Sequence, residues 1–305
     1  MTKFLNARIL ASLGMIVFVA ALIAGGTGAF FSDTETSTGN TFTAGAIDLT
    51  IDSEQHYNGN VCVPNEEDGP QYVWAGNSSF PVPGTECDGT WDATDLGAHK
   101  FFNFTDVKPG DEGENTISLH IDSNPAWMCV DIALTENDDV DCTEPENEAE
   151  GDGICNTDGA PAFDGELAEN LHFFAWLDDG SVDGFQNSDD IPENDDAEEG
   201  DNIWQDGEIP LFSNGAGPLS DTLGGVTYAL ADSLTGFGPI PGGMTQYIGL
   251  SWCAGNYIVN GPGSLTCDGS TMGNEAQTDS AVADVSFRVV QSRNNDNFVC
   301  EPLID

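Results

Sequence analysis

The feature that most constrains the fold is a two-residue alternation of apolar and polar side chains in several short segments. In the first of them, Ile47, Leu49 and Ile51 are separated by Asp48 and Thr50. Successive side chains of a strand point to opposite faces of its sheet, so this period buries one face and leaves the other to water. The same alternation recurs in four later segments, which span residues 117–121, 128–134, 248–252 and 285–289.

The remaining periodic segments carry weaker signals. Two further strands are expected over 100–105 and 171–177, whereas only 166–170 and 219–233 carry faint helical patterns. Turns rich in glycine, proline and asparagine separate the segments. Antiparallel sheets can bury one face and hydrate the other, which suits this pattern. The sequence therefore predicts an all-β fold, an antiparallel sandwich of jelly-roll type.

Long acidic connections lie between the predicted strands. Residues 136–158 contain ten carboxylates and residues 178–208 contain thirteen. We interpret these connections, with a Cys-, Pro- and Gly-rich stretch near 55–96, as insertions stapled by disulfides. The prediction is a single sandwich domain over 44–305, with insertions at about 55–96, 136–165 and 178–208.

The charge of the chain excludes two classes of partner. There are 53 Asp and Glu residues against 6 Lys and Arg, a formal net charge of -47. Nucleic acids and anionic membrane surfaces would be repelled, because both are bound through many cationic side chains. A carboxylate-rich surface keeps a protein hydrated in saline water, so the composition is typical of a halophilic protein.

The N-terminus has the anatomy of a secretory signal. Lys3 and Arg8 precede an apolar run over 9–24, which is followed by small residues. A retained transmembrane helix is the alternative, but the run is shorter than the roughly 20 residues that such a helix needs. We predict a signal peptide over 1–29, cleaved near Ala29, and a secreted protein of the extracellular matrix or cell surface without a stable membrane anchor.

The cysteines agree with export. Their number is even and no two of them have the close spacing of a metal site, so up to four disulfides are expected. Cys142 with Cys155 and Cys253 with Cys267 are plausible loop staples, but about 105 pairings remain possible. The candidates are Cys62, Cys87, Cys129, Cys142, Cys155, Cys253, Cys267 and Cys300.

Three motifs carry a family resemblance. The glycine-rich end of the leader runs into Phe-Phe-Ser-Asp-Thr-Glu at 30–35, and Thr-Phe-Thr-Ala-Gly-Ala-Ile-Asp-Leu follows at 41–49. A Val-Lys-Pro-Gly-Asp turn at 107–111 precedes an alternating strand. Together these motifs resemble the TasA/camelysin family of exported proteins, which a dedicated signal peptidase processes. The eight cysteines and the insertions depart from the soluble bacterial members, and the acidic style of the chain looks closer to archaeal members from salty habitats.

The resemblance implies a structural role. Family members build biofilm-matrix fibres or bundling surface filaments from jelly-roll subunits, and the N-terminal segment of one subunit can complete the sheet of the next. Residues 30–43 would be this donor-strand-like segment, with Phe31 and Phe42 as its apolar anchors. The partners would be further copies of the chain, joined head to tail, and the signal peptidase during export. The alternative is a leader followed by an ordinary first strand.

A catalytic role finds little support in the residues. Camelysin is associated with metallopeptidase activity, so a secreted metallopeptidase is the alternative function that the resemblance implies. The four histidines, His56, His99, His120 and His172, are isolated in the sequence, and there is no H-E-x-x-H motif. That motif would place two zinc-binding imidazoles on one helical face with a glutamate base. We therefore predict no catalytic residues.

Calcium is the cofactor that the sequence favours. Two glycine-containing turns carry clustered oxygen ligands of the kind that this ion prefers, although neither has the spacing of an EF-hand. The alternative is a merely solvated acidic loop, and we assign the run 144–152 to that class. A calcium site would also suit a third function, that of a monomeric calcium-dependent surface adhesin. The predicted ligands are Asp178, Asp179, Asp201, Asn202, Asp206 and Glu208.

Overall fold

The computed structural model divides the chain into two compact units, Met1–Phe31 and Ser32–Asp305. The residues that it describes all belong to the second unit, and they are 32–36, 48–66, 69–122, 124–141, 143–149, 165–180, 196–212 and 215–302. The predicted signal peptide and the anchors Phe31 and Phe42 thus lie outside the described residues. Within these ranges, no helix has the length and apolar character needed to cross a membrane.

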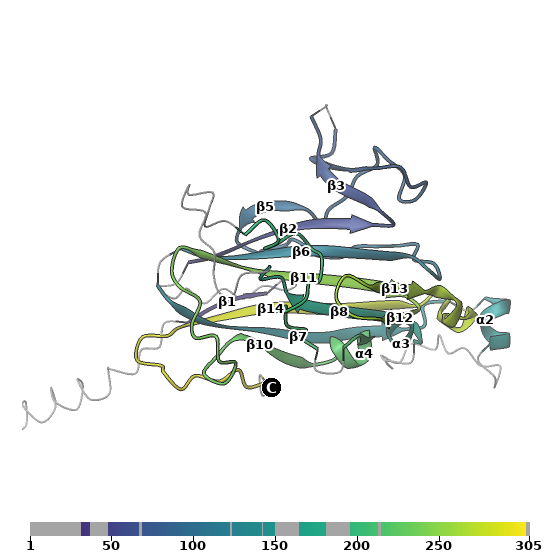
Figure 1. The fold of residues 1–305 in the computed structure, drawn as a ribbon. Helices are drawn as coiled ribbons and strands as arrows, with labels where there is room; N and C mark the ends of the chain where they lie inside the picture. The colour runs from purple at the N-terminus through teal and green to yellow at the C-terminus, as the bar shows by residue number, and fades with distance from the viewer. Residues whose placement is uncertain are drawn as a thin grey trace, which may run out of the picture. The chain divides into compact units, whose positions relative to one another are not determined.

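The strands of the second unit form two main antiparallel sheets (Figure 1). The smaller sheet has the order β1 (Ser32–Thr36), β14 (Ser280–Gln291), β7 (Ala126–Asp138) and β10 (Val226–Ala231). The larger sheet follows the order β4 (Tyr72–Ala75), β3 (Asn60–Pro64), β2 (Leu49–Tyr57), β6 (Glu112–Ile121), β11 (Met244–Ala254), β8 (Leu171–Leu177) and β9 (Gly217–Pro218), and β5 (Trp91–Thr94) pairs with β2. A separate pair contains β12 (Asn256–Val259) and β13 (Leu265–Asp268). This arrangement confirms the predicted all-β, antiparallel sandwich.

The main core lies between the two sheets. Leu119 of β6, in the larger sheet, belongs to the same buried cluster as Met128 of β7 and Val289 of β14, in the smaller one, and all three side chains are fully buried. Burial alternates along β2 from Leu49 to Tyr57, as the period of two predicts. The hydrophobic effect on the alternating faces therefore holds the sandwich together.

Each alternating segment lies largely within a strand, but the strand expected over 100–105 is absent. Phe101 is buried against Trp91 and Phe287. Its carbonyl oxygen accepts hydrogen bonds from Nε2 of Gln55 at 2.6 Å and from Nδ2 of Asn115 at 3.3 Å. Two side-chain amides thus satisfy a backbone group that a neighbouring strand would otherwise have to satisfy.

The described helices are all short. They are α2 (Glu144–Ala149), α3 (Leu167–Asn170), α4 (Leu219–Thr222), and the 3-10 turns η1 (Gly269–Thr271) and η2 (Asn274–Ala276). The weak helix predicted over 166–170 is largely confirmed as α3. The one predicted over 219–233 is mostly wrong, because α4 ends before Gly224 and Gly225, and β10 follows. Gly225 has a φ of 85°, which a continuing right-handed helix does not allow.

The region around 55–96 adds strands to the larger sheet. β2 continues to Tyr57, and Asn58 and Gly59, both with positive φ, turn the chain into β3. Such a two-residue Asn-Gly turn matches the twist of a hairpin. β3, β4 and β5 all lie in this region and pair within the sheet. In the other two predicted insertions, residues 150–164 and 181–195 lie outside the described ranges.

Three disulfides are present among the described residues. They join Cys62 to Cys87, Cys129 to Cys300 and Cys253 to Cys267. The last of these confirms one predicted loop staple, whereas Cys142 and Cys155 lie outside the described residues. Disulfides of this kind fit an extracellular protein.

Candidate functional site

The N-terminal segment occupies one edge of the smaller sheet. β1 pairs with β14 in an antiparallel register that runs from Ser32 opposite Val290 to Thr36 opposite Ser286. On its other side β14 pairs with β7 along its full length. A short segment from the start of the described chain is therefore the outermost strand of this sheet, as Figure 1 shows.

A polar network fixes the strand that receives β1. Arg288 of β14 donates to both carboxylate oxygens of Asp131 on β7, at 3.1 and 3.2 Å, and Asp131 is nearly buried. The hydroxyl of Thr227 on β10 donates to the same carboxylate at 2.6 Å. Arg288 also donates to the carbonyl oxygen of Glu301 at 2.8 Å. These contacts cross three strands and hold β14 in register while its far edge accepts β1.

Two carboxylates are buried together at the end of β8. Asp178 directly follows this strand and has no exposed surface, and its Oδ2 accepts the backbone N–H of Asn202 at 2.8 Å. Glu208 accepts the N–H of Gly180 at 2.9 Å and that of Gln205 at 2.6 Å. Burial raises the pKa of Asp178 to about 8, and the charge of Glu208 adds to the rise. The hydrogen bond from the N–H of Asn202 acts in the opposite direction and lowers this pKa. Burial also raises the pKa of Glu208.

The structure brings three of the six predicted calcium ligands together. Asp178, Asn202 and Glu208 are all buried in this cluster. The carboxylate of Asp179 instead accepts a hydrogen bond from Nε2 of Gln246. Asp201 and Asp206 are exposed, and Asp201 accepts from the side-chain amide of Gln205.

A second acidic cluster was missed by the sequence reasoning. Carboxylate oxygens of Asp139, Glu146 and Asp279 lie within 4.8 Å of one another. Glu146 is fully buried, so the interpretation of 144–152 as a merely solvated run is wrong at this position. The N–H of Thr143 donates to Glu146 at 2.9 Å, and the Thr143 hydroxyl accepts the N–H of Glu146 at 3.4 Å. This reciprocal pair is a capping box, and Thr-x-x-Glu is the signal that could have found it.

The carboxylates of this second cluster accept several hydrogen bonds from nearby groups. Glu146 also accepts from the hydroxyl of Thr278, at 3.1 Å. Oδ2 of Asp279 accepts the N–H groups of Glu166 and Leu167, at 2.6 and 2.9 Å, where α3 begins. Three carboxylates at this spacing could share a cation, but their hydrogen bonds join α2 and α3 to Thr278 and Asp279, just before β14. Burial raises the pKa of Asp279 to about 7, and the neighbouring carboxyl of Asp139 adds to the rise.

Replacing Asp279 with asparagine is expected to remove part of the pH dependence of stability. The folded-state pKa of about 7 lies above the ordinary 3.8, so the folded chain binds an extra proton between these values. The stabilisation of the folded chain that this proton provides is complete below about pH 4 and is lost as the pH rises towards about 7. Relative to the variant, the wild-type chain should lose on the order of 2 kcal/mol of unfolding free energy over this window, after a discount for solvent screening.

Urea unfolding at a series of pH values, in the presence of a chelator, measures this difference. Asparagine keeps an oxygen that can accept the two N–H groups of α3, so the variant should fold. Asp221→Asn, on the exposed side of α4, is the control and should keep the wild-type profile. Parallel pH profiles for wild type and Asp279→Asn would contradict the prediction.

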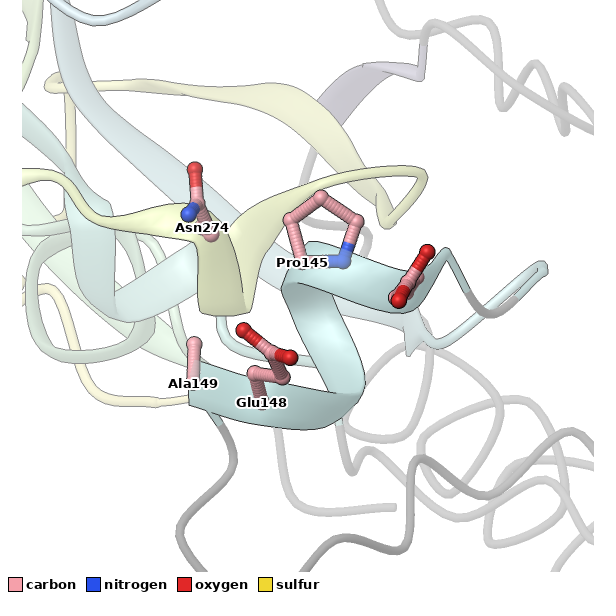
Figure 2. Close-up of a pocket in the computed structure, with 5 residues that line it drawn as sticks. Pro145, Glu148, Ala149 and Asn274 are labelled. Carbon is pink, nitrogen blue, oxygen red and sulfur yellow. The ribbon is translucent and has the colours of Figure 1, made fainter.

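A shallow hollow of about 360 Å³ lies on the surface beside α2. Figure 2 shows Pro145, Glu148 and Ala149 on this helix, with Asn274 of η2 across from them. Glu144 completes the lining. None of these described residues is cationic or a predicted metal ligand.

The histidines lie in separate surroundings. His56 on β2 contacts Glu54 and Glu114, and His120 on β6 contacts Asp52. His99 stacks on Trp91, and burial lowers its pKa. Among the residues that the structure describes, no histidine belongs to a group of three candidate ligands within 4.8 Å of one another.

Comparison with known proteins bears on the N-terminal part of the chain. No curated protein and no solved structure matches it. Residues 5–65 match the model of the camelysin metallo-endopeptidase family. The match includes the leader motif and the 41–49 motif on which the predicted resemblance rests. Over this N-terminal region, the chain is therefore similar to the camelysin family, as its motifs predict.

Proposed function

We propose that this chain is a secreted structural protein, a subunit of an extracellular or cell-surface filament of the biofilm-matrix kind. The observation that supports the proposal is the edge position of β1, which adds to β14 through backbone pairing over Ser32–Thr36. Backbone hydrogen bonds of this kind are the same whether the strand comes from the same copy or from a neighbouring one. In a filament, β1 of one copy pairs with β14 of the next.

The length of the connection favours exchange between copies. Twelve residues separate Thr36 from Leu49, where β2 begins. An extended chain of this length spans up to about 40 Å, enough to reach a neighbouring subunit. A strand that leaves one copy and enters the next makes a head-to-tail contact, which generates an open-ended assembly.

The charge sets the conditions for assembly. After removal of the leader, four basic residues remain against 53 acidic ones. Neighbouring subunits then repel each other unless salt or divalent cations screen the charge. Fibres should therefore be sought at high salt and with calcium.

Deletion of residues 31–43 is expected to give folded monomers that form no fibres under the electron microscope. The deletion removes the donor strand but leaves both faces of the sandwich core in place. Far-ultraviolet circular dichroism checks the fold of the monomers. Fibres of normal appearance from the deleted chain would overturn the proposal.

Two proline variants provide a matched control within β1. In an antiparallel pair, alternate residues direct their N–H groups to the neighbouring strand. One of Asp33→Pro and Thr34→Pro therefore loses a main-chain hydrogen bond to β14, and the other loses only an outward-facing N–H. The variant that loses the hydrogen bond to β14 should form no fibres, whereas the other variant should keep more of them. This difference is expected because backbone pairing of the strands, rather than the identity of the side chains, holds the filament together.

A secreted metallopeptidase is the second candidate, favoured by the match of residues 5–65 to the camelysin metallo-endopeptidase family. The test is cleavage of casein by the purified protein with and without a chelator. Chelator-sensitive cleavage would support this candidate, and its absence would leave the structural role.

A further inference from the structure

The acidic cluster at the end of β8 contains buried oxygen atoms that hydrogen bonds do not satisfy. Oδ1 of Asn202 and Oε1 of Gln205 are buried without a hydrogen-bond partner. Oδ1 of Asp178 is buried as well, and when the Asp178 carboxyl holds a proton its side-chain partner is Glu208. Asn202 is 7% exposed, and its side-chain nitrogen also lacks a partner. Buried polar groups without partners are rare in folded proteins and indicate a missing ligand, such as an ion.

Backbone hydrogen bonds join the residues of this cluster. The backbone N–H of Asn202 donates to Asp178 and that of Gln205 donates to Glu208. These two contacts place the backbone of Asn202 beside the Asp178 carboxylate and that of Gln205 beside the Glu208 carboxylate. The Gln205 amide is held from the solvent side, where its Nε2 donates to Asp201, while its Oε1 is buried.

The backbone around the cluster holds it in a fixed shape. The N–H of Asp178 donates to the carbonyl oxygen of Tyr247 on β11, and the N–H of Gly200 donates to the carbonyl oxygen of Asp178, both at 3.1 Å. Gly180 has a φ of 68°, and a Cβ at this position would come within 2.5 Å of Asp196. A turn this tight needs glycine. The larger sheet thus positions the cluster before any ligand binds.

We propose that Asp178, Asn202, Gln205 and Glu208 bind one calcium ion. Two carboxylates buried side by side repel each other unless a proton or a cation lies between them, and a divalent ion balances the charge of both. Calcium accepts six to eight hard oxygen ligands from carboxylates, amides and water in flexible geometry. Magnesium demands a stricter octahedron and retains several waters, which suits a buried cluster of mixed amides and carboxylates less well.

The test begins with the chelator-treated mature chain. Terbium, which replaces calcium at oxygen sites, should emit on excitation of tryptophan, because the indole N–H of Trp204 lies 3.3 Å from the carbonyl oxygen of Glu208. Calcium should displace terbium with one-to-one stoichiometry, and magnesium should displace it at least tenfold less effectively. Trp204→Phe should lower the sensitised emission while calorimetry still shows calcium binding.

Substitutions locate the ion. Asp178→Asn and Glu208→Gln should each weaken calcium binding at least tenfold, since each removes one charge from the buried pair. Asp206→Asn is the matched control from the same loop, because its carboxylate is exposed, and it should bind calcium as the wild type does. Calcium should raise the melting temperature of this control but not that of Asp178→Asn.

Three results would overturn the proposal. The first is a wild-type chain without a tight calcium site, in which case the two carboxyl groups share a proton only. The second is an equal loss of affinity in Asp178→Asn, Glu208→Gln and Asp206→Asn, which would indicate diffuse binding by the acidic surface. The third is displacement of terbium by magnesium as readily as by calcium. The first and third results come from titrations of the wild-type chain, so they do not depend on how the variants fold.

Discussion

Two variants that each add one cysteine to the chain, Thr36→Cys and Ser286→Cys, mixed and assembled together, are expected to form a disulfide-linked dimer. The register of β1 and β14 places these two residues opposite each other, and opposite residues in an antiparallel pair have Cβ atoms about 5 Å apart. If each copy donates its β1 to the next, the two engineered cysteines come from different molecules. Non-reducing electrophoresis after the fibres are dissolved in denaturant detects the link.

The double variant, Thr36→Cys with Ser286→Cys in one chain, makes the effect larger. Assembled fibres should give a ladder of covalent oligomers, whereas a strand that stays in its own copy gives a monomer closed by an internal link. The pair Thr36→Cys and Val290→Cys is the control. Val290 pairs with Ser32, four residues out of register, so about 13 Å along the strand separates the two sulfurs. If the double variant forms only disulfides within one chain, and the mixture of the two variants forms no disulfide-linked dimer, then β1 is not exchanged between copies.

This experiment and the calcium titration fail independently. The ion proposed at Asp178 and Glu208 lies within one subunit, at the end of β8 in the larger sheet, whereas β1 pairs in the smaller sheet. A chain that binds calcium but never forms the covalent ladder would be a monomeric calcium-dependent surface protein. A chain that forms the ladder without binding calcium would use its acidic loops for solvation.

The sequence alone predicts most of the strands of the sandwich, because the alternation of buried and exposed side chains in a strand depends only on neighbouring residues. A period of two puts Leu49 and Ile51 on one face whatever the rest of the chain does, and both are fully buried. The segment 100–105 failed for the opposite reason. The carbonyl of Phe101 is satisfied by Gln55 and Asn115, which belong to strands distant in the sequence. No local pattern reveals which side-chain amide will reach a given carbonyl.

The same distinction applies to the acidic residues. The glycine-containing turns directed attention to Asp178 and Glu208, both of which are buried, but composition could not show that Asp201 and Asp206 face the solvent. Asp279 comes together with Glu146 through a contact that spans more than a hundred residues, and sequence alone does not predict such a meeting. Burial, rather than the density of carboxylates, decides which acids interact.

Removal of the Cys129–Cys300 disulfide, by alanine at both positions, is expected to lower the free energy of unfolding by about 5 kcal/mol. The two cysteines are 171 residues apart, so the bond restricts the unfolded chain over a long loop, and the entropic stabilisation grows with loop length. A loss of this size is comparable with the whole stability of many domains. Urea unfolding under oxidising conditions measures it.

The Cys253–Cys267 bond supplies the matched control, because its closed loop spans 14 residues and its loss should cost about 3 kcal/mol. Cys129 and Cys253 are both fully buried, so alanine leaves a similar void at each, and the difference between the variants reports loop length. Equal losses would show that local packing, not chain entropy, carries the effect. Without the Cys129–Cys300 bond, the carbonyl oxygen of Glu301 is held less firmly beside Arg288, but Arg288 still contacts Asp131. We therefore expect β14 to accept β1 wherever the variant remains folded.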